Sequence, residues 1–343
     1  MKILLVHFAS KGLLNDAIIL YIYINKLFQS LEFEVTIEIL STDAPEISYS
    51  EHDQSFTYPN EIKPDVVIHI QDIYEIKNLA FDEAQHILLP NPEWTNQHTA
   101  KRVHHINAIW HKTYYSQRAF LKAFVGAKVE HYYLGFTTID RNLRVNNFNS
   151  FAHFRGAGVA RNTDKIFDIW KRRSDYPLLR VKFHSGDRSL VFLNCLSWFR
   201  VNNIEIKHGF SADDEEYFSE LTASGGLHLC TSEMEGFGHY INESRMLGAV
   251  PVVINGFPMS ELVDSNSGFL VQPNHTESLN LSLRYKITED ALEKIIDTIL
   301  GETQSTLEKI GQNARERYDE DRRSFISHLY TACKHIRHKY ETK

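Results

Sequence analysis

The chain has 343 residues, of which 43% are hydrophobic and 24% charged, and its formal net charge is −7 at pH 7. This length suits two domains of ordinary size, and the composition is that of a globular protein in which each half can bury a core. The negative charge argues against a dedicated nucleic-acid-binding protein, which would usually be basic.

The cysteines and the apolar runs indicate which cellular compartment the protein occupies and whether it spans a membrane. Cys195, Cys230 and Cys333 are widely spaced and form no CxxC pair, which fits a reducing compartment and indicates no thiolate metal site. We see no secretory signal. The most apolar later stretch, residues 17–24, is too short to span a bilayer. We therefore expect a cytoplasmic protein, and contact with a membrane surface stays open.

The first half of the chain alternates strand-like and helix-like segments. A Lys11-Gly12 turn separates the first strand from the first helix. The predicted strands are residues 2–8, 33–40, 64–70, 85–90, 107–110 and 129–134, and the predicted helices are residues 14–30 and a segment from residue 114 onward. This alternation predicts a parallel sheet covered by helices on both faces.

A polar, Asn-rich segment at residues 141–152 predicts a linker, and a second α/β series follows it. Its predicted strands are residues 151–154, 179–184, 203–207, 226–230, 250–254 and 269–271, and its predicted helices are residues 163–173, 287–300, 304–318 and 321–340. Two α/β units of similar size predict two Rossmann-like domains facing each other across a cleft, the first at residues 1–148 and the second at residues 149–320.

The strongest chemical signal lies in residues 229–243, where a buried strand leads through a glycine-bearing turn into a helix. Such a turn presents backbone N–H groups and the positive end of a helix dipole, which suits a diphosphate. Gly236 and Gly238 let the backbone approach a ligand. Glu235 can accept hydrogen bonds from sugar hydroxyls, and Glu243 can bind a ribose diol. The alternative is an ordinary turn with solvated glutamates.

The whole stretch of residues 229–263 resembles the signature of glycosyltransferase family 4, a large family of retaining GT-B glycosyltransferases. That signature runs strand, Ser, two residues, Glu-Gly-Phe-Gly, four residues and Glu, followed by Pro-Val-Val and Glu-Leu-Val. Glu235 and Glu243 keep the Glu-x7-Glu spacing of this family. The chain departs from it at Ser244, where relatives often have alanine.

This resemblance implies a role for each matching residue. Glu243 would hold the ribose hydroxyls, and Glu235 would bind hydroxyls of the donor sugar. Phe237 and Gly238 would offer main-chain N–H groups to the donor, and Glu261 would lie near the nucleotide.

A second signal is the glycine-containing loop between Gly156 and Arg161. Relatives place two basic side chains here, which neutralise the leaving diphosphate. Arg161 matches the second position, and its planar fork can bond two phosphate oxygens. The first position falls on Ala157, so Arg155 or Lys182 would have to substitute. The alternative is a plain strand–helix loop with one surface arginine.

The N-terminal half is expected to hold the acceptor. Gly12, after the first strand, resembles the glycine loop that faces the donor phosphates in the family. Asn91 and Glu93 follow a buried strand, at the place where open α/β sheets bind ligands. The peptides around them loosely resemble a bacterial polysaccharide-type subgroup. The alternative for Glu93 is a carboxylate at a helix start, stabilised by the dipole.

The resemblance implies a retaining transfer of a hexose from a UDP- or GDP-linked donor to a glycan or a lipid-linked acceptor. Helix N-termini and Arg161 would stabilise the leaving diphosphate in place of a metal. We expect neither a metal nor a cofactor, because the acidic run at residues 213–216 is typical of an opening helix turn and the histidines lack metal-ligand spacing. The alternatives are a catalytically degenerate GT-B protein that binds a nucleotide or a glycan, and a nucleotide-sugar epimerase.

The C-terminal helix, residues 321–343, carries several basic residues and an apolar stripe at helical spacing. Such a helix could lie on an anionic membrane. We favour the alternative that its apolar face packs back onto the N-terminal domain.

Overall fold

The computed structural model describes residues 1–43, 48–50, 55–74, 76–79, 83–156, 160–183, 202–209 and 214–342. The chain folds as two compact units. The first consists of Met1–Thr137, Leu279–Ser282 and Asp321–Lys343, and the second of Thr138–Ser278 and Leu283–Glu320. Each unit is therefore assembled from segments that are distant in the sequence.

The first unit is built on a six-stranded sheet with the order β2-β1-β5-β7-β8-β9, and all its neighbouring strands pair in parallel. The apolar runs of the four inner strands are buried, as expected for a parallel sheet that is covered on both faces. The strands are β1 (Lys2–His7), β2 (Thr36–Ser41), β5 (Val66–Gln71), β7 (Gln85–Pro90), β8 (Ala108–His111) and β9 (Glu130–Tyr133). Each predicted strand of this half is present.

The first helix of this unit starts at a polar cap. α1 (Lys11–Ser30) begins after Ser10, whose hydroxyl accepts a hydrogen bond from the Leu13 N–H at 3.2 Å. The predicted Lys11-Gly12 turn is therefore wrong, because both residues lie in the first turn of α1. The remaining helices are the 3₁₀ turns η2 (Pro92–Trp94) and η3 (Val103–His105), with α2 (Gln97–Arg102) and α3 (Tyr114–Ala123).

A small three-stranded sheet in the first unit was not predicted. It has the order β3-β4-β6, with β3 (Ser48–Ser50) antiparallel and β6 (Ile76–Leu79) parallel to β4 (Ser55–Ile62). Its strands are rich in polar residues, and β4 contains a proline, so they lack the apolar run or the clean alternation that predicts a strand.

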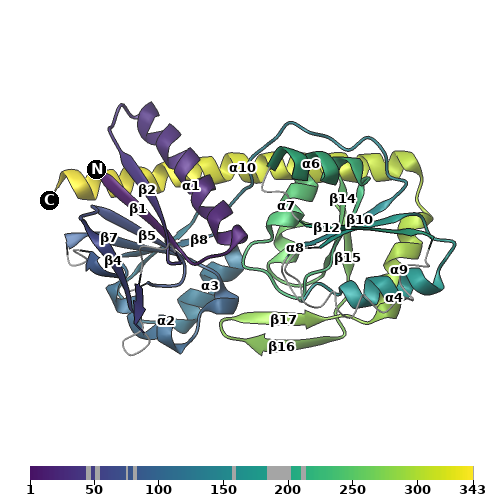
Figure 1. Cartoon of the computed structure of the whole chain (residues 1–343), viewed down its shortest axis with the longest axis horizontal. Helices are drawn as coiled ribbons and strands as arrows, with labels where there is room; N and C mark the ends of the chain where they lie inside the picture. Colours follow the sequence, from purple (N-terminus) through teal and green to yellow (C-terminus); the bar gives the residue numbers. More distant parts are fainter. Residues whose placement is uncertain are drawn as a thin grey trace. The chain divides into compact units, whose positions relative to one another are not determined.

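The second unit repeats the architecture of the first. Its six-stranded sheet has the order β12-β11-β10-β13-β14-β15, again with parallel pairs throughout (Figure 1). The strands are β10 (Phe151–Gly156), β11 (Leu179–Phe183), β12 (Ile204–His208), β13 (Leu227–Cys230), β14 (Val250–Ile254) and β15 (Phe269–Val271). The helices are α4 (Thr163–Arg172), α6 (Asp214–Ala223), α7 (His239–Met246), α8 (Met259–Leu262) and α9 (Glu289–Leu300). The predicted α/β class with two Rossmann-like domains is confirmed.

The segment expected to be a linker is packed onto the second unit. The Val145 N–H donates to the Leu247 carbonyl at 3.0 Å, and the Phe148 ring is buried. A Cβ on Gly226 would lie 2.5 Å from that ring, so only glycine fits beneath it. The polar composition of this segment reflects extended coil on a surface rather than a free tether.

Two C-terminal features differ from the prediction. α10 (Gln304–Glu341) is one helix of 38 residues, not two, and its end belongs to the first unit. There Phe325, Leu329 and Ile336 are buried, and the Phe325 ring packs edge-on against Tyr23 at 5.4 Å between centroids. The apolar stripe of this helix is thus enclosed within the protein. The polar two-stranded sheet of β16 (His275–Leu279) and β17 (Ser282–Lys286) was not predicted.

Within the described residues, no helix combines the length and the apolar character needed to cross a bilayer.

Candidate functional site

The glycine-bearing motif follows β13, which pairs with β10 in the middle of the second sheet. Three hydrogen bonds join the loops after these two strands. The Thr231 hydroxyl donates to the Arg161 carbonyl at 2.7 Å, and the Asn162 amide donates to the Thr231 carbonyl at 2.9 Å. The Glu233 N–H donates to the Ala160 carbonyl at 3.0 Å. The two signals found in the sequence therefore meet at the carboxyl edge of the sheet, where open α/β folds bind ligands.

Arg161 and Glu235, the two predicted catalytic residues, are in direct contact. Arg161 Nη1 lies 2.5 Å from Glu235 Oε1 and 2.5 Å from Ser232 Oγ. Ser232 Oγ donates in turn to the same carboxylate oxygen at 2.6 Å. The side chains of Arg161 and Glu235 keep 20% and 13% of their surface exposed. A cation and a carboxylate thus share a short hydrogen-bonded triangle that solvent can still reach.

Tyr240 completes this cluster, although no sequence signal pointed to it. The guanidinium carbon of Arg161 lies 4.3 Å from the centroid of its ring, a cation–π contact. The Tyr240 hydroxyl donates to Ser232 Oγ and accepts from the Ser232 N–H, both at 2.9 Å. Tyr240 lies in the first turn of α7, so its role depends on how that helix packs, which the sequence does not show.

Electrostatics keep this cluster charged at Arg161 and neutral at Tyr240. Burial acts to lower the pKa of Arg161, but Glu235 and then Tyr240 raise it, and the result lies above its ordinary value. Burial raises the pKa of Tyr240 above its usual range.

Beneath the loops, burial lowers the pKa of His153 to about 4, and the His153 ring forms hydrogen bonds with the Leu229 carbonyl and the Thr163 hydroxyl. His153 is therefore a neutral structural group.

The predicted donor-binding glycines occupy the turns that the motif requires. Gly238 has φ 97° and caps α7, and a Cβ there would come within 3.0 Å of Ile241 Cδ1. Gly156 has φ 62° at the end of β10, with open space where a Cβ would lie. Gly236 and Phe237 are buried within the motif loop. Any larger residue at position 238 would meet both backbone strain and a contact.

Glu243 lies in α7 and is buried. Its Oε2 accepts a hydrogen bond of 2.8 Å from the Tyr217 hydroxyl of α6. Burial and then the Glu243 carboxylate raise the pKa of Tyr217, which keeps the phenol protonated as a donor. Tyr217 was not predicted, because the residues before α6 give no periodic signal that sets the face it presents.

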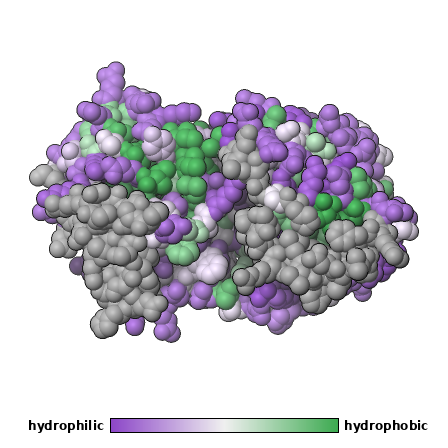
Figure 2. All heavy atoms as spheres, in the orientation of Figure 1, coloured by the Kyte–Doolittle hydropathy of each residue, from purple (hydrophilic) through white to green (hydrophobic). Residues whose placement is uncertain are grey.

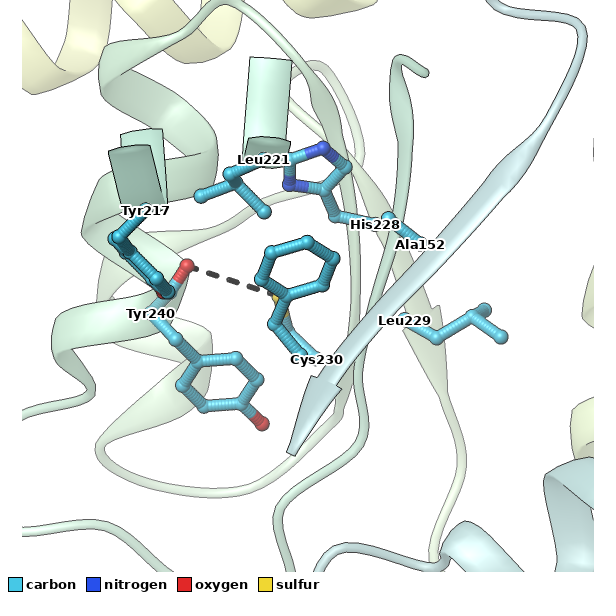
Figure 3. A pocket seen from close by; sticks show the side chains of 8 residues that line it. Ala152, Tyr217, Leu221, His228, Leu229, Cys230 and Tyr240 are labelled. Carbon is cyan, nitrogen blue, oxygen red and sulfur yellow. Dashed lines mark hydrogen bonds between the residues drawn. The ribbon is translucent and has the colours of Figure 1, made fainter. Parts of the chain in front are cut away.

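A pocket lies beneath the motif, between β10, β13 and the helices α6 and α7. Figure 3 shows Cys230 beside the Tyr240 main chain, with Cys230 Sγ 3.9 Å from the Tyr240 carbonyl oxygen. Burial raises the pKa of the Cys230 thiol and lowers that of His228 to about 4. The pocket is lined by Ala152, Phe154, Tyr217, Leu221, His228, Leu229, Cys230 and Tyr240. Its neutral, mostly apolar wall supports packing rather than proton transfer.

The first basic position of the family pattern, Ala157, lies outside the described residues. Of the two candidate substitutes, Lys182 is buried and forms an ion pair with Glu220. Arg155 is also buried, with its guanidinium carbon 5.7 Å from the Phe183 ring centroid. The charge of Lys182 is therefore already balanced within its own face of the sheet.

Two further cations adjoin the motif loop. Arg284 Nε and Lys286 Nζ, both on β17, lie 2.6 Å and 2.8 Å from Oε2 of the buried Glu233. The Tyr285 N–H between them donates to the Glu233 carbonyl at 2.8 Å. This unpredicted anchor holds the motif loop against β17.

The other predicted residues belong to the first unit, whereas the Arg161 cluster belongs to the second. Gly12 is exposed in the first turn of α1. Asn91 and Glu93 are buried after β7. The Asn91 amide donates to Gln71 Oε1 at 3.4 Å, and the Glu93 carbonyl accepts from the Asn280 amide at 2.6 Å. Asn91 and Glu93 therefore lie at the carboxyl edge of the first sheet, as expected.

No cluster of three or more histidine, cysteine, aspartate or glutamate side chains is arranged to hold a metal within the described ranges. The acidic run predicted to open a helix begins at Asp213, outside those ranges, and its remaining members form the first turn of α6.

The sequence matches no known protein-family model and no curated protein. The structure is similar to that of a glycosyltransferase from Rickettsia africae, with a TM-score of 0.66, 14% identity and 98% of each chain covered. It is also similar to the pneumococcal O-GlcNAc transferase GtfA in complex with UDP and GlcNAc, with a TM-score of 0.69, 9% identity and coverage of 98% and 99%. Anabaena Alr3699/HepE in complex with UDP and glucose gives a TM-score of 0.62 at 14% identity, with both chains fully covered. The chain therefore has the GT-B fold.

Proposed function

We propose that this chain is a metal-independent glycosyltransferase that moves a hexose from a nucleotide diphosphate sugar to a glycan or a lipid-linked acceptor. The observation that carries the proposal is the contact between Arg161, Ser232 and Glu235 at the carboxyl edge of the second sheet. Solved structures of the same fold that contain UDP and a sugar support a UDP-linked donor.

The cluster offers a diphosphate and a sugar complementary partners. Glu235 is the counter-ion of Arg161 in the structure. A phosphate oxygen of the donor would take this place, because the guanidinium fork matches phosphate geometry and remains protonated. The Glu235 carboxylate would then accept hydrogen bonds from hydroxyls of the donor sugar. Backbone N–H groups at Phe237, Gly238 and the start of α7 would bind the diphosphate.

Glu243 would bind the ribose of the nucleotide. The Tyr217 hydroxyl holds Oε2 of this carboxylate at 2.8 Å, which fixes its orientation. A buried carboxylate that is held in one orientation can accept a hydrogen bond from each of the two hydroxyls of a vicinal diol.

The proposed reaction retains the anomeric configuration, as the family 4 resemblance implies. The bond between the anomeric carbon and the diphosphate oxygen breaks, and the acceptor oxygen forms a bond to that carbon on the same face. The acceptor proton passes to the departing phosphate. Arg161 stabilises the charge that develops on the diphosphate, so no metal is needed for this step. Glu235 positions the sugar and forms no covalent bond to it.

The first unit would hold the acceptor near Asn91 and Glu93, and Gly12 would face the phosphates of the donor. Asn91 and Glu93 place an amide and a carboxylate at the carboxyl edge of the first sheet, and such groups bond sugar hydroxyls. A cytoplasmic location fits a donor that is made in that compartment.

A nucleotide-binding panel tests the donor site directly. Isothermal titration with UDP, GDP and ADP, each with and without EDTA, is expected to show one preferred diphosphate whose affinity EDTA leaves unchanged. At about 100 times its dissociation constant, that ligand should stabilise the fold by about 2.7 kcal/mol in a thermal shift. Loss of binding in EDTA would contradict a metal-independent site.

Matched arginine variants then test the cluster. Arg161→Met should lower turnover of the preferred nucleotide sugar by about 10²–10³-fold, the usual cost of removing one stabilising donor. Arg172→Met removes an exposed arginine of α4, paired with Glu289 and Glu293, and should leave turnover unchanged. If the two variants lose the same activity, or if neither does, the assignment of Arg161 is wrong.

A further inference from the structure

Helix α1 has apolar residues on two sides. Its inner side packs on the first sheet and includes the buried Leu20, Ile24 and Phe28. Its outer side carries a second stripe of Leu14, Ile18, Tyr21 and Ile22, which we call the α1 outer face. Leu14 and Tyr21 are 39% and 41% exposed, and Ile18 and Ile22 are partly exposed.

The spacing of these four residues places them side by side along one face of the helix. Figure 2 shows hydrophobic surface gathered where α1 lies in Figure 1. The solvent side of a surface helix is normally polar, and a contiguous apolar patch marks an interaction site. In the apolar run of residues 17–24, some side chains are buried in the core, whereas Ile18, Tyr21 and Ile22 belong to the α1 outer face.

The exposed charged side chains of α1 itself have one sign. Lys11 and Lys26 are exposed near its two ends. The one acidic residue of α1, Asp16, is buried on the other side and forms an ion pair with Lys112 at 2.8 Å. This local pattern contrasts with the net charge of −7 for the whole chain. Cations beside an apolar stripe complement an anionic lipid surface, where the stripe enters the headgroup region and lysines meet the headgroups.

We propose that the α1 outer face docks on an anionic lipid bilayer, with α1 lying parallel to the membrane plane. Tyr21 suits the boundary between headgroups and acyl chains, because its ring is apolar and its hydroxyl is polar, as in the aromatic belts of membrane proteins. The proposal concerns a second property of the chain and does not depend on its transferase activity. It also replaces the C-terminal helix as the membrane-binding element, since Phe325, Leu329 and Ile336 of α10 are buried.

Vesicle sedimentation of the full chain tests the proposal. Binding is expected to vesicles of phosphatidylcholine with phosphatidylglycerol, to weaken with added salt, and to be much weaker for phosphatidylcholine alone. Ile18→Gln/Ile22→Gln should reduce the partition coefficient by about tenfold, because two apolar contacts are lost. Lys11→Gln/Lys26→Gln should weaken binding and flatten its salt dependence.

A control pair carries the same chemical change elsewhere in the first unit. Leu121→Gln/Val125→Gln alters two residues that are 49% and 85% exposed and should leave vesicle binding unchanged. Equal binding by the wild type and Ile18→Gln/Ile22→Gln, or no binding by either, overturns the proposal. So does a wild-type dimer that becomes monomeric in Ile18→Gln/Ile22→Gln without any vesicle binding, because the occupant is then a second copy.

Circular dichroism shows whether each variant is folded, and nucleotide affinity is measured on the same samples. That affinity separates the two proposals. Nucleotide binding without vesicle binding would defeat the membrane proposal alone, and vesicle binding without any nucleotide binding would defeat the proposed function alone.

Discussion

Both units place an ion pair at the carboxyl edge of a parallel sheet, but the two pairs differ in exposure. In the first unit, Lys112 follows β8 and contacts Asp16 of α1 at 2.8 Å, with 2% of each side chain exposed. In the second unit, Arg161 contacts Glu235 at 2.5 Å, with 20% and 13% exposed. The same topology therefore presents one pair that is sealed inside the fold and one that solvent reaches.

The difference determines what each pair can do. The Lys112–Asp16 pair cannot exchange a partner unless the core opens. This pair therefore affects the free energy of unfolding and not ligand binding. The Arg161–Glu235 pair lies on loops that are joined by hydrogen bonds rather than buried in a helix–sheet interface. A ligand can replace one partner there. A ligand site in this fold thus needs more than a position at the strand ends, since it also needs charges that are left accessible.

The largest expected effect is on the sealed pair. Lys112→Met should destabilise the chain by about 3–5 kcal/mol, because the buried Asp16 loses the counter-ion of its ion pair. Lys112→Met/Asp16→Leu should recover most of this loss. Urea unfolding followed by circular dichroism measures both. Wild-type stability in Lys112→Met would show that Asp16 is hydrated and that the two pairs do not differ as described.

Substitutions at the accessible site should change turnover and nucleotide affinity. Glu235→Ala should lower turnover by about 10²-fold, because the donor sugar loses the carboxylate that positions it. Nucleotide affinity should be kept, because Arg161 still binds the diphosphate. Glu243→Ala should weaken nucleotide binding by about 10–100-fold, since a hydrogen-bonding charged group is removed. Steady-state kinetics and titration calorimetry separate the two effects. If both variants keep wild-type affinity and rate, the site lies elsewhere.

Acid should weaken the support beneath the accessible pair. Burial lowers the pKa of His153 to about 4 in the folded chain, whereas the unfolded chain binds a proton near pH 6.5. The stability due to neutral His153 is therefore present above pH 6.5 and is lost as the pH falls toward 4, by about 1.4 kcal/mol per pH unit. In urea unfolding at several pH values, His153→Gln should have a slope smaller by this amount. An unchanged slope would contradict a buried neutral histidine.

The smallest effect is expected at Tyr240. Tyr240→Phe keeps the ring against Arg161 but removes the two hydrogen bonds to Ser232, at a cost of about 0.5–1.5 kcal/mol each. Nucleotide affinity should fall by about threefold to tenfold. Tyr240→Leu, which also removes the cation–π contact, should weaken binding further. Equal affinities for both variants would show that the ring contributes nothing to the position of Arg161.

The sequence predicted the strands that run through the core of each unit, because their short apolar runs have only one stable place in a parallel sheet. It missed β3, β4 and β6 and the pair β16 and β17. The burial of β16 shows why, since four of its five residues are exposed and no apolar pattern marks them. The predicted break near residue 320 was wrong because the acidic run there is compatible with a helix, in which Arg315 pairs with Asp319 four residues on.

Within the candidate site, the family resemblance assigned Arg161 and Glu235 to one donor site, and the structure brings them into contact. Tyr217, Tyr240 and the Glu233 anchor were missed. Each of them acts through the packing of a helix or through β17. Such contacts between separate elements produce no regular spacing in the sequence from which they could be predicted. The acceptor residues Asn91 and Glu93 and the donor role of Gly12 stay predictions.

The division of α10 between the two units has a consequence for synthesis on the ribosome. Residues Met1–Thr137 are translated before residues 138–320, yet their unit lacks Asp321–Lys343 until those residues have also been translated. At about 5–20 residues per second, this delay lasts on the order of ten seconds or more. During that time the aromatic seat of Phe325, formed by Tyr23 and Phe136, is uncovered in the nascent chain. The first unit to be translated is therefore completed last, and its open seat is a natural target for a holding chaperone.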